Sequence, residues 1–149
     1  MKIFLADLTY TQQSIASDVV PAGIGMIAEY TEKKIPNLEK IKLFKFPEDL
    51  SLALKDQKPD IIGFSNYIWN SSLTDVYLKT IKEICPNTIT VAGGPNFPTD
   101  LKEQNEYLSK RPWIDFYIVK EGEHAFYSLI NYLIDKKITK MQEINEKNY

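Results

Sequence analysis

Short apolar runs alternate along the chain with longer segments in which apolar residues recur at helical spacing. Four of the runs are almost continuously apolar, as is typical of strands buried on both faces of a parallel sheet. A fifth, at residues 40–46, alternates Ile41 and Leu43 with charged residues, which predicts a half-buried edge strand. The strands are therefore expected at residues 2–6, 40–46, 61–65, 88–92 and 115–119.

The segments between these runs predict helices opening at Pro21, Pro47, Leu73 and Asp100, with a last helix after Glu123. Strand and helix thus alternate five times, which favours an α/β protein with a parallel sheet covered on both faces. We expect a flavodoxin-like (Rossmann-like) three-layer sandwich, and the edge-like second strand favours the strand order 2-1-3-4-5. Ligands of such sheets bind beyond the carboxyl ends of the strands.

Two of the predicted strands end in residues that suit a ligand. Thr90 to Ala92 leads into Gly93-Gly94-Pro95, where a bare backbone leaves room for close approach. Such a sequence also fits an ordinary tight turn between strand and helix. The strand ending at Ser65 is followed by two amides and two aromatic rings, which form either a wall for a planar ligand or a plug for the end of the sheet. These residues are Asn66, Tyr67, Trp69 and Asn70.

The composition of the chain reduces the number of function classes to consider. The 149 residues carry a net charge of −2 and are 44% hydrophobic, which fits one globular domain and disfavours a nucleic-acid surface. No apolar run approaches the roughly 20 residues of a membrane span, and we expect a cytoplasmic protein. The single cysteine, Cys85, excludes an internal disulfide or a multi-cysteine iron–sulfur site in this chain.

The motifs of several other ligand-binding and catalytic classes are absent or incomplete in the sequence. The first strand is not followed by the glycine pattern of nicotinamide-binding domains, and Ser65 stands where a phosphoacceptor domain has its acid. Thr9, Thr11 and Ser14 offer hydroxyls for an FMN phosphate, although no glycine lets that loop wrap around it. His124 is the only histidine, and no catalytic constellation surrounds it. The chain is expected to bind a ligand rather than to transform one.

Four motifs in order carry a family resemblance: Pro21-Ala22-Gly23-Ile24-Gly25, residues 62–70, residues 91–95, and Val119-Lys120-Glu121-Gly122-Glu123. They resemble the N-terminal cobalamin (B12)-binding domain of class B radical SAM enzymes, a group that includes the anaerobic Mg-protoporphyrin monomethyl ester cyclase and B12-dependent methyltransferases. The resemblance implies cobalamin held above the strand ends with its nucleotide tail threaded into the sheet edge.

The same resemblance implies site residues. Ser65 would contact the nucleotide tail, and Gly93 and Gly94 would leave room for it. Tyr67, Trp69 and the turn at 121–123 would line the cofactor or a neighbouring catalytic domain. The implied cofactor-binding set is Thr9, Pro21, Gly23, Ser65, Asn66, Tyr67, Trp69, Asn70, Gly93, Gly94, Pro95, Glu121, Gly122 and Glu123, with no catalytic or metal-ligating residue.

Two family features are absent from the chain. Residues 7–12 lack the histidine of the D-x-H-x-x-G motif, so this loop supplies no histidine to cobalt. The C-x-x-x-C-x-x-C motif is also absent, which places S-adenosylmethionine and a 4Fe-4S cluster in a radical SAM barrel in cis outside this chain. We expect a non-catalytic cobalamin-binding module at residues 1–137 and a polar linker or frayed tail at 138–149. The alternatives are a degenerate domain of the same fold that docks on the barrel without binding cobalamin and an FMN-binding flavodoxin-like electron carrier.

Overall fold

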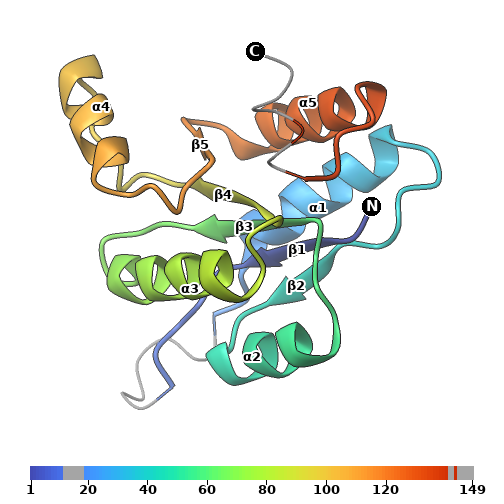
Figure 1. Cartoon of the computed structure of the whole chain (residues 1–149), viewed down its shortest axis with the longest axis horizontal. Helices are drawn as coiled ribbons and strands as arrows, with labels where there is room; N and C mark the ends of the chain where they lie inside the picture. Colours follow the sequence, from blue (N-terminus) through green and yellow to red (C-terminus); the bar gives the residue numbers. More distant parts are fainter. Residues whose placement is uncertain (12–18, 141–142, 144–149) are drawn as a thin grey trace.

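The computed structural model describes residues 1–11, 19–140 and 143, and strands alternate with helices throughout this part of the chain (Figure 1). The elements in chain order are β1 (Ile3–Ala6), α1 (Ala22–Lys34), β2 (Lys42–Phe44), α2 (Pro47–Asp56), β3 (Ile61–Ser65), α3 (Ser71–Ile84), β4 (Ile89–Gly93), α4 (Leu101–Ser109), β5 (Phe116–Ile118) and α5 (Gly122–Asp135). Ser14, considered above as a phosphate ligand, lies outside the described residues.

The strands form one parallel sheet in the order β2-β1-β3-β4-β5, which confirms the predicted fold class and topology. The strand order reverses between β1 and β3. As a result α1 and α5 lie together on one face of the sheet, and α2 and α3 cover the other (Figure 1). The carboxyl ends of β3 and β4 meet at the edge of the sheet from which the loops to α3 and α4 depart.

Each face of the sheet has its own core. Side chains from alternate strand positions, such as Leu5 and Val91, pack against α1 and α5. The intervening positions, such as Phe4 and Ala92, pack against α2 and α3 together with Cys85, which is buried. Because both faces are covered, the central strands are apolar at nearly every position, as the sequence pattern indicated.

The edge strand β2 departs from its predicted pattern. Ile41 is buried as expected, but Leu43 is 44% exposed and Phe44 is buried instead. Leu43 pairs with Leu5, yet at the outer edge the layer of α1 and α5 no longer covers it. Phe44 faces the other side of the sheet and packs on Phe4, with 4.9 Å between the ring centroids.

Beyond α5 the chain still contributes to the core. Lys137 has a φ of 53°, which turns the backbone out of the helix, and Ile138 is fully buried among residues of the α1 and α5 face. Ile138 therefore contributes to the core on the α1 and α5 face. The division of the chain into a domain ending at residue 137 and a polar tail stays a prediction.

Candidate ligand-binding site

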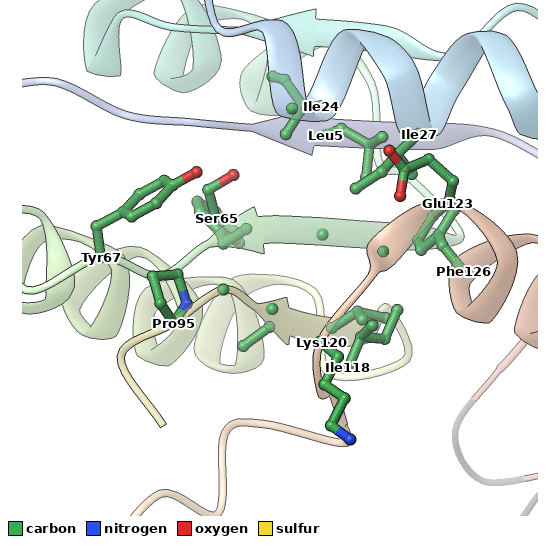
Figure 2. A pocket seen from close by; sticks show the side chains of 18 residues that line it. Leu5, Ile24, Ile27, Ser65, Tyr67, Pro95, Ile118, Lys120, Glu123 and Phe126 are labelled. Carbon is green, nitrogen blue, oxygen red and sulfur yellow. The ribbon is translucent and has the colours of Figure 1, made fainter. Parts of the chain in front are cut away.

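A cavity of about 330 Å³ opens on the α1 and α5 face of the sheet, at the carboxyl ends of β3 and β4 (Figure 2). This volume is at the lower end of the range for small-molecule sites, which is roughly 300–1,000 Å³. The wall is mostly apolar and is supplied by β1, α1, β5 and α5. Its large apolar side chains are Leu5, Ile24, Ile27, Ile118 and Phe126.

Two strand glycines, Gly63 and Gly93, line the cavity. A Cβ on Gly63 would lie 2.6 Å from Cδ2 of Leu5 and 3.7 Å from Cε2 of Phe126. A Cβ on Gly93 would lie at ordinary contact distance, 3.5 Å from the carbonyl oxygen of Ile118. Gly63 and Gly93 stand at strand positions whose side chains would point toward these cavity-lining residues. A larger side chain at Gly93 would therefore extend into the cavity, whereas a Cβ on Gly63 would first collide with the side chain of Leu5.

Gly94 has a different role from Gly93. Its φ is +125°, a conformation that favours glycine, and a Cβ there would lie 2.6 Å from the backbone oxygen of Asn66. The N–H of Asn66 donates to the carbonyl of Gly93 over 2.6 Å, and the N–H of Asn96 donates to the carbonyl of Asn66 over 3.2 Å. Gly94 thus permits a tight turn between the ends of β3 and β4, and Pro95 after it lines the cavity.

Polar side chains reach the cavity from both ends. Ser65 and Tyr67 lie at the carboxyl ends of the strands, and Glu123 lies beside Phe126 in the first turn of α5 (Figure 2). None of these three side chains has a hydrogen-bond or ion-pair partner within the part of the chain that the structure describes. Burial, and then the charge of Asp7, raise the pKa of the Tyr67 hydroxyl, so it remains a donor at neutral pH. The cavity therefore offers hydrogen bonds to a bound ligand.

The two amides after β3 do not line the cavity. Asn66 is 2% exposed, and its Nδ2 donates to the hydroxyls of Tyr107 over 2.8 Å and of Tyr117 over 3.2 Å. Asn70 is fully buried; its Oδ1 accepts from the N–H of Tyr67 over 2.8 Å, and its Nδ2 donates to the carbonyl of Leu8 over 3.2 Å. These bonds hold the β3–α3 loop in place beneath the cavity rim.

The aromatic residues of this loop form a stacked pair. The rings of Tyr67 and Trp69 are 4.4 Å apart and within 7° of parallel. Tyr67 lines the cavity, whereas Trp69 is 67% exposed and stands outside it. The pair therefore forms a two-ring stack at the cavity rim, with Trp69 on the solvent side, and it does not plug the sheet.

The other predicted site residues divide by position. Gly23 and Gly122 line the cavity together with Glu123. Gly122 also sets the approach of the two helices, since a Cβ on it would lie 2.6 Å from Cδ1 of Ile27. Besides Asn66, Asn70 and Trp69, three further predicted residues do not line the cavity. They are Thr9, whose N–H donates to the carbonyl of Lys45, Pro21 before α1, and the exposed Glu121 before α5.

Sequence reasoning missed the apolar wall. Leu5, Ile24, Ile27, Ile118 and Phe126 follow strand and helix periodicity and are indistinguishable in the sequence from ordinary core residues. Lys120 also lines the cavity but was not in the predicted set. It lies in the turn before α5, where its φ is 68°. Gly63 did carry a signal, because a glycine inside a buried strand often marks close approach of another group.

Neither a cluster of metal-ligating side chains nor a membrane-spanning helix is present among the described residues. These residues hold no group of three or more histidine, cysteine, aspartate or glutamate side chains arranged around a possible metal ion. His124 is exposed, with its Nδ1 3.4 Å from the hydroxyl of Ser128. Within the same residues, no helix combines the length and apolarity needed to cross a bilayer.

A five-stranded parallel sheet with an apolar, glycine-opened cavity at its strand ends defines an α/β ligand-binding domain. Residues 11–130 match the model of the B12 binding domain, and the chain belongs to this family. It is related to cobalamin-dependent radical SAM enzymes, as the sequence motifs indicated.

Three relatives document this relationship. The chain is 30% identical over 119 residues to the cobalamin-dependent radical SAM methyltransferase TokK of Streptomyces tokunonensis, and 26% identical over 118 residues to the 2-(S-pantetheinyl)-carbapenam-3-carboxylate methyltransferase of Streptantibioticus cattleyicolor. Each match covers 74% of this chain and 16% of the relative. It is 28% identical over 83 residues to the anaerobic magnesium-protoporphyrin IX monomethyl ester cyclase of Cereibacter sphaeroides, covering 56% of this chain and 13% of that protein. The matched region is thus a small part of each relative.

Proposed function

We propose that this chain is the cobalamin-binding module of a larger radical SAM enzyme and that its cavity holds the nucleotide tail of the cofactor. The observation that carries the proposal is the pair of glycines, Gly63 and Gly93, which open an apolar cavity at the strand ends of a B12-binding domain. Cobalamin, when bound, supplies a cobalt centre able to carry a methyl group. The module itself binds and orients the cofactor and is not catalytic alone.

The residues present fit a nucleotide tail. A planar base suits a cavity whose wall is mostly apolar, with side chains such as Ile27, Ile118 and Phe126. Ser65 and Tyr67, without partners in the described residues, provide hydrogen bonds at the end nearer the rim. The corrin ring would then lie above the strand ends, beside the exposed face of Trp69.

The cobalt would receive no histidine from the first loop. The segment Asp7-Leu8-Thr9-Tyr10-Thr11-Gln12 contains none, and the single histidine of the chain stands on α5. The proposed binding mode would therefore rest on contacts with the nucleotide tail and the corrin, without a histidine from this loop.

The proposed partner is a radical SAM barrel in cis. The relatives named as radical SAM or methyltransferase enzymes are about six times longer than the matched region, so S-adenosylmethionine, a 4Fe-4S cluster and the substrate would belong to their remaining parts. We propose a cytoplasmic setting for the whole enzyme.

Titration with hydroxocobalamin tests the proposal. The chain at about 100 µM, where a micromolar site is nearly saturated, should change the visible spectrum of the cofactor and co-elute with it on gel filtration. Cobinamide, which lacks the nucleotide tail, should bind at least about tenfold more weakly. Equal binding of the two would contradict the use of the cavity by the tail.

Two leucine variants locate the site. Gly93→Leu should abolish binding, because its side chain would enter the cavity, and should leave the fold intact because a Cβ there meets only ordinary contacts. Gly25→Leu is the matched control, since a Cβ on this helical glycine meets nothing within 4 Å and Gly25 does not line the cavity. Absence of binding by the wild-type chain would identify a degenerate docking domain, and a yellow protein with flavin absorbance would identify an FMN carrier.

A further inference from the structure

Glu123 places a carboxylate at the α5 side of an otherwise apolar part of the cavity. Its neighbours in the wall are Ile27 and Phe126, whereas Ser65 and Tyr67 stand at the strand-end side. Figure 2 shows the Glu123 carboxylate turned toward the region of Leu5 and Ile27, with the Lys120 amine directed away from the cavity. Lys120 therefore does not neutralise the carboxylate.

The Glu123 carboxylate also lacks a partner. No hydrogen bond or ion pair joins it to any other residue among those that the structure describes. A carboxylate oxygen only accepts hydrogen bonds, and enclosing it against apolar groups without a donor is unfavourable. A ligand that fills the cavity would meet this carboxylate and exclude water from it. The best ligand is therefore one that brings an N–H or O–H donor to this end.

The common lower base of cobalamin, dimethylbenzimidazole, has no such donor. Joined to ribose through one ring nitrogen, it carries a second nitrogen that only accepts, and two methyl groups on its outer rim. Adenine, the lower base of pseudocobalamin, carries an exocyclic amine on its rim. The two cofactors share the corrin and the ribose phosphate and differ in the lower base, both in the groups it presents inside the cavity and in how strongly it coordinates cobalt.

We propose that Glu123 is a specificity-determining residue that selects cobamides whose lower base carries a hydrogen-bond donor. This inference rests on the proposed function, in which the cavity receives the nucleotide tail. Ser65 and Tyr67 interact at the end common to all cobamides, and Glu123 distinguishes their bases. The chain should accordingly prefer pseudocobalamin to cobalamin.

A purely structural explanation of Glu123 makes a different prediction. An acidic residue in the first turn of a helix favours that helix through the helix dipole, and Glu123 occupies this position in α5. If this were its whole role, replacing Glu123 would change stability and leave the ratio of the two affinities unchanged. The affinity ratio therefore separates selection from helix stabilisation.

The test compares the aquo forms of cobalamin and pseudocobalamin on the 149-residue chain by spectral titration. The wild-type chain should bind pseudocobalamin about tenfold more tightly, the amount expected for one hydrogen bond to a charged group. Glu123→Leu should reduce this preference about tenfold relative to the wild-type chain. Glu121→Leu, two residues earlier and outside the cavity, should retain the wild-type ratio.

The outcomes separate the two proposals. Equal affinities in the wild-type chain, a preference for cobalamin, or an unchanged ratio in Glu123→Leu would each overturn the role of Glu123 while leaving the cofactor-binding function standing. Binding of neither cofactor would overturn the proposed function and this inference together. Circular dichroism of Glu123→Leu at the titration temperature verifies that the compared chains are folded.

Discussion

The carbonyl oxygen of Asn66 lies 2.6 Å from the position that a Cβ on Gly94 would occupy. This close approach joins the end of β3 to the end of β4, where the cavity wall begins. The two adjacent glycines therefore have different roles: Gly93 leaves space in the cavity, and Gly94 permits the turn.

Gly94→Ala should therefore destabilise the fold. A φ of +125° is strained for alanine and its Cβ would collide with backbone, so we expect a loss of about 1–3 kcal/mol in the free energy of unfolding. Urea denaturation measures it. Gly25→Ala is the control and should gain about 0.5–1 kcal/mol, as expected in an open helical position. Equal stability of Gly94→Ala and the wild-type chain would show that the turn relaxes freely.

Gly122→Ala should loosen the packing of α1 against α5. The new methyl group would lie 2.6 Å from Cδ1 of Ile27, and overpacking of this kind costs about 1–3 kcal/mol. Ile27→Val removes Cδ1 and should recover part of this loss in the double variant. A double-mutant cycle by urea denaturation measures the coupling. Strictly additive effects would mean that the helices do not meet at this contact.

Asp7→Asn should stabilise the chain at neutral pH. Burial raises the pKa of Asp7 above 3.8, more than the nearby Lys45 lowers it, so the folded state disfavours the charged carboxylate. The amide oxygen can still accept from Nδ2 of Asn70, 3.4 Å from Oδ1 of Asp7. The gain should shrink as the pH falls and vanish below pH 3.8, where Asp7 is protonated in both states.

Thermal unfolding from pH 3 to 7 follows this difference, and Glu39→Gln in an exposed loop serves as the control. A gain that persists unchanged at pH 3 would exclude the charge of Asp7 as its origin.

Tyr117→Phe should destabilise the fold by about 1–3 kcal/mol, because it removes a hydroxyl that donates to the carbonyl of Gly94 and accepts from Asn66. Burial raises the pKa of Tyr117 well above 10, so the wild-type stability contribution is complete below pH 10 and is lost as the pH rises beyond it. The difference between the two chains should narrow in that alkaline range. Urea denaturation at pH 8 and pH 11 measures the difference in the free energy of unfolding between the two chains. If this difference is the same at both pH values, burial does not raise the pKa of the Tyr117 hydroxyl.

Trp69→Ala should leave stability nearly unchanged, within about 0.5 kcal/mol, because the side chain is 67% exposed. If the stacked pair with Tyr67 faces the corrin, the affinity for hydroxocobalamin should fall several-fold. Thermal unfolding and spectral titration give the two quantities. If Trp69→Ala binds hydroxocobalamin as tightly as the wild-type chain, Trp69 does not contact the corrin and only holds the ring of Tyr67 in place.

The strand order and the location of the cavity followed from the sequence, because continuous apolar runs and the edge-like pattern of residues 40–46 reflect burial directly. The exposure of Leu43 did not follow, since it depends on how far α1 and α5 extend over the sheet edge. Asn66 and Asn70 looked like ligand-binding amides because their partners, such as Tyr107 and Leu8, are distant in the sequence. The apolar wall of the cavity could not be predicted, because residues that line a cavity and residues that fill a core follow the same sequence pattern. They differ only in whether empty space lies between the side chains.

The burial of Cys85 on the α2 and α3 face gives the chain a practical property. It is the single cysteine and is 5% exposed, so thiol reagents should leave it unmodified in the folded protein. A cysteine introduced at Ile68, which is 80% exposed beside the stacked aromatic pair, would then be the sole reactive site. A fluorophore attached there would report ligand entry at the cavity rim without any background label on the opposite face of the sheet.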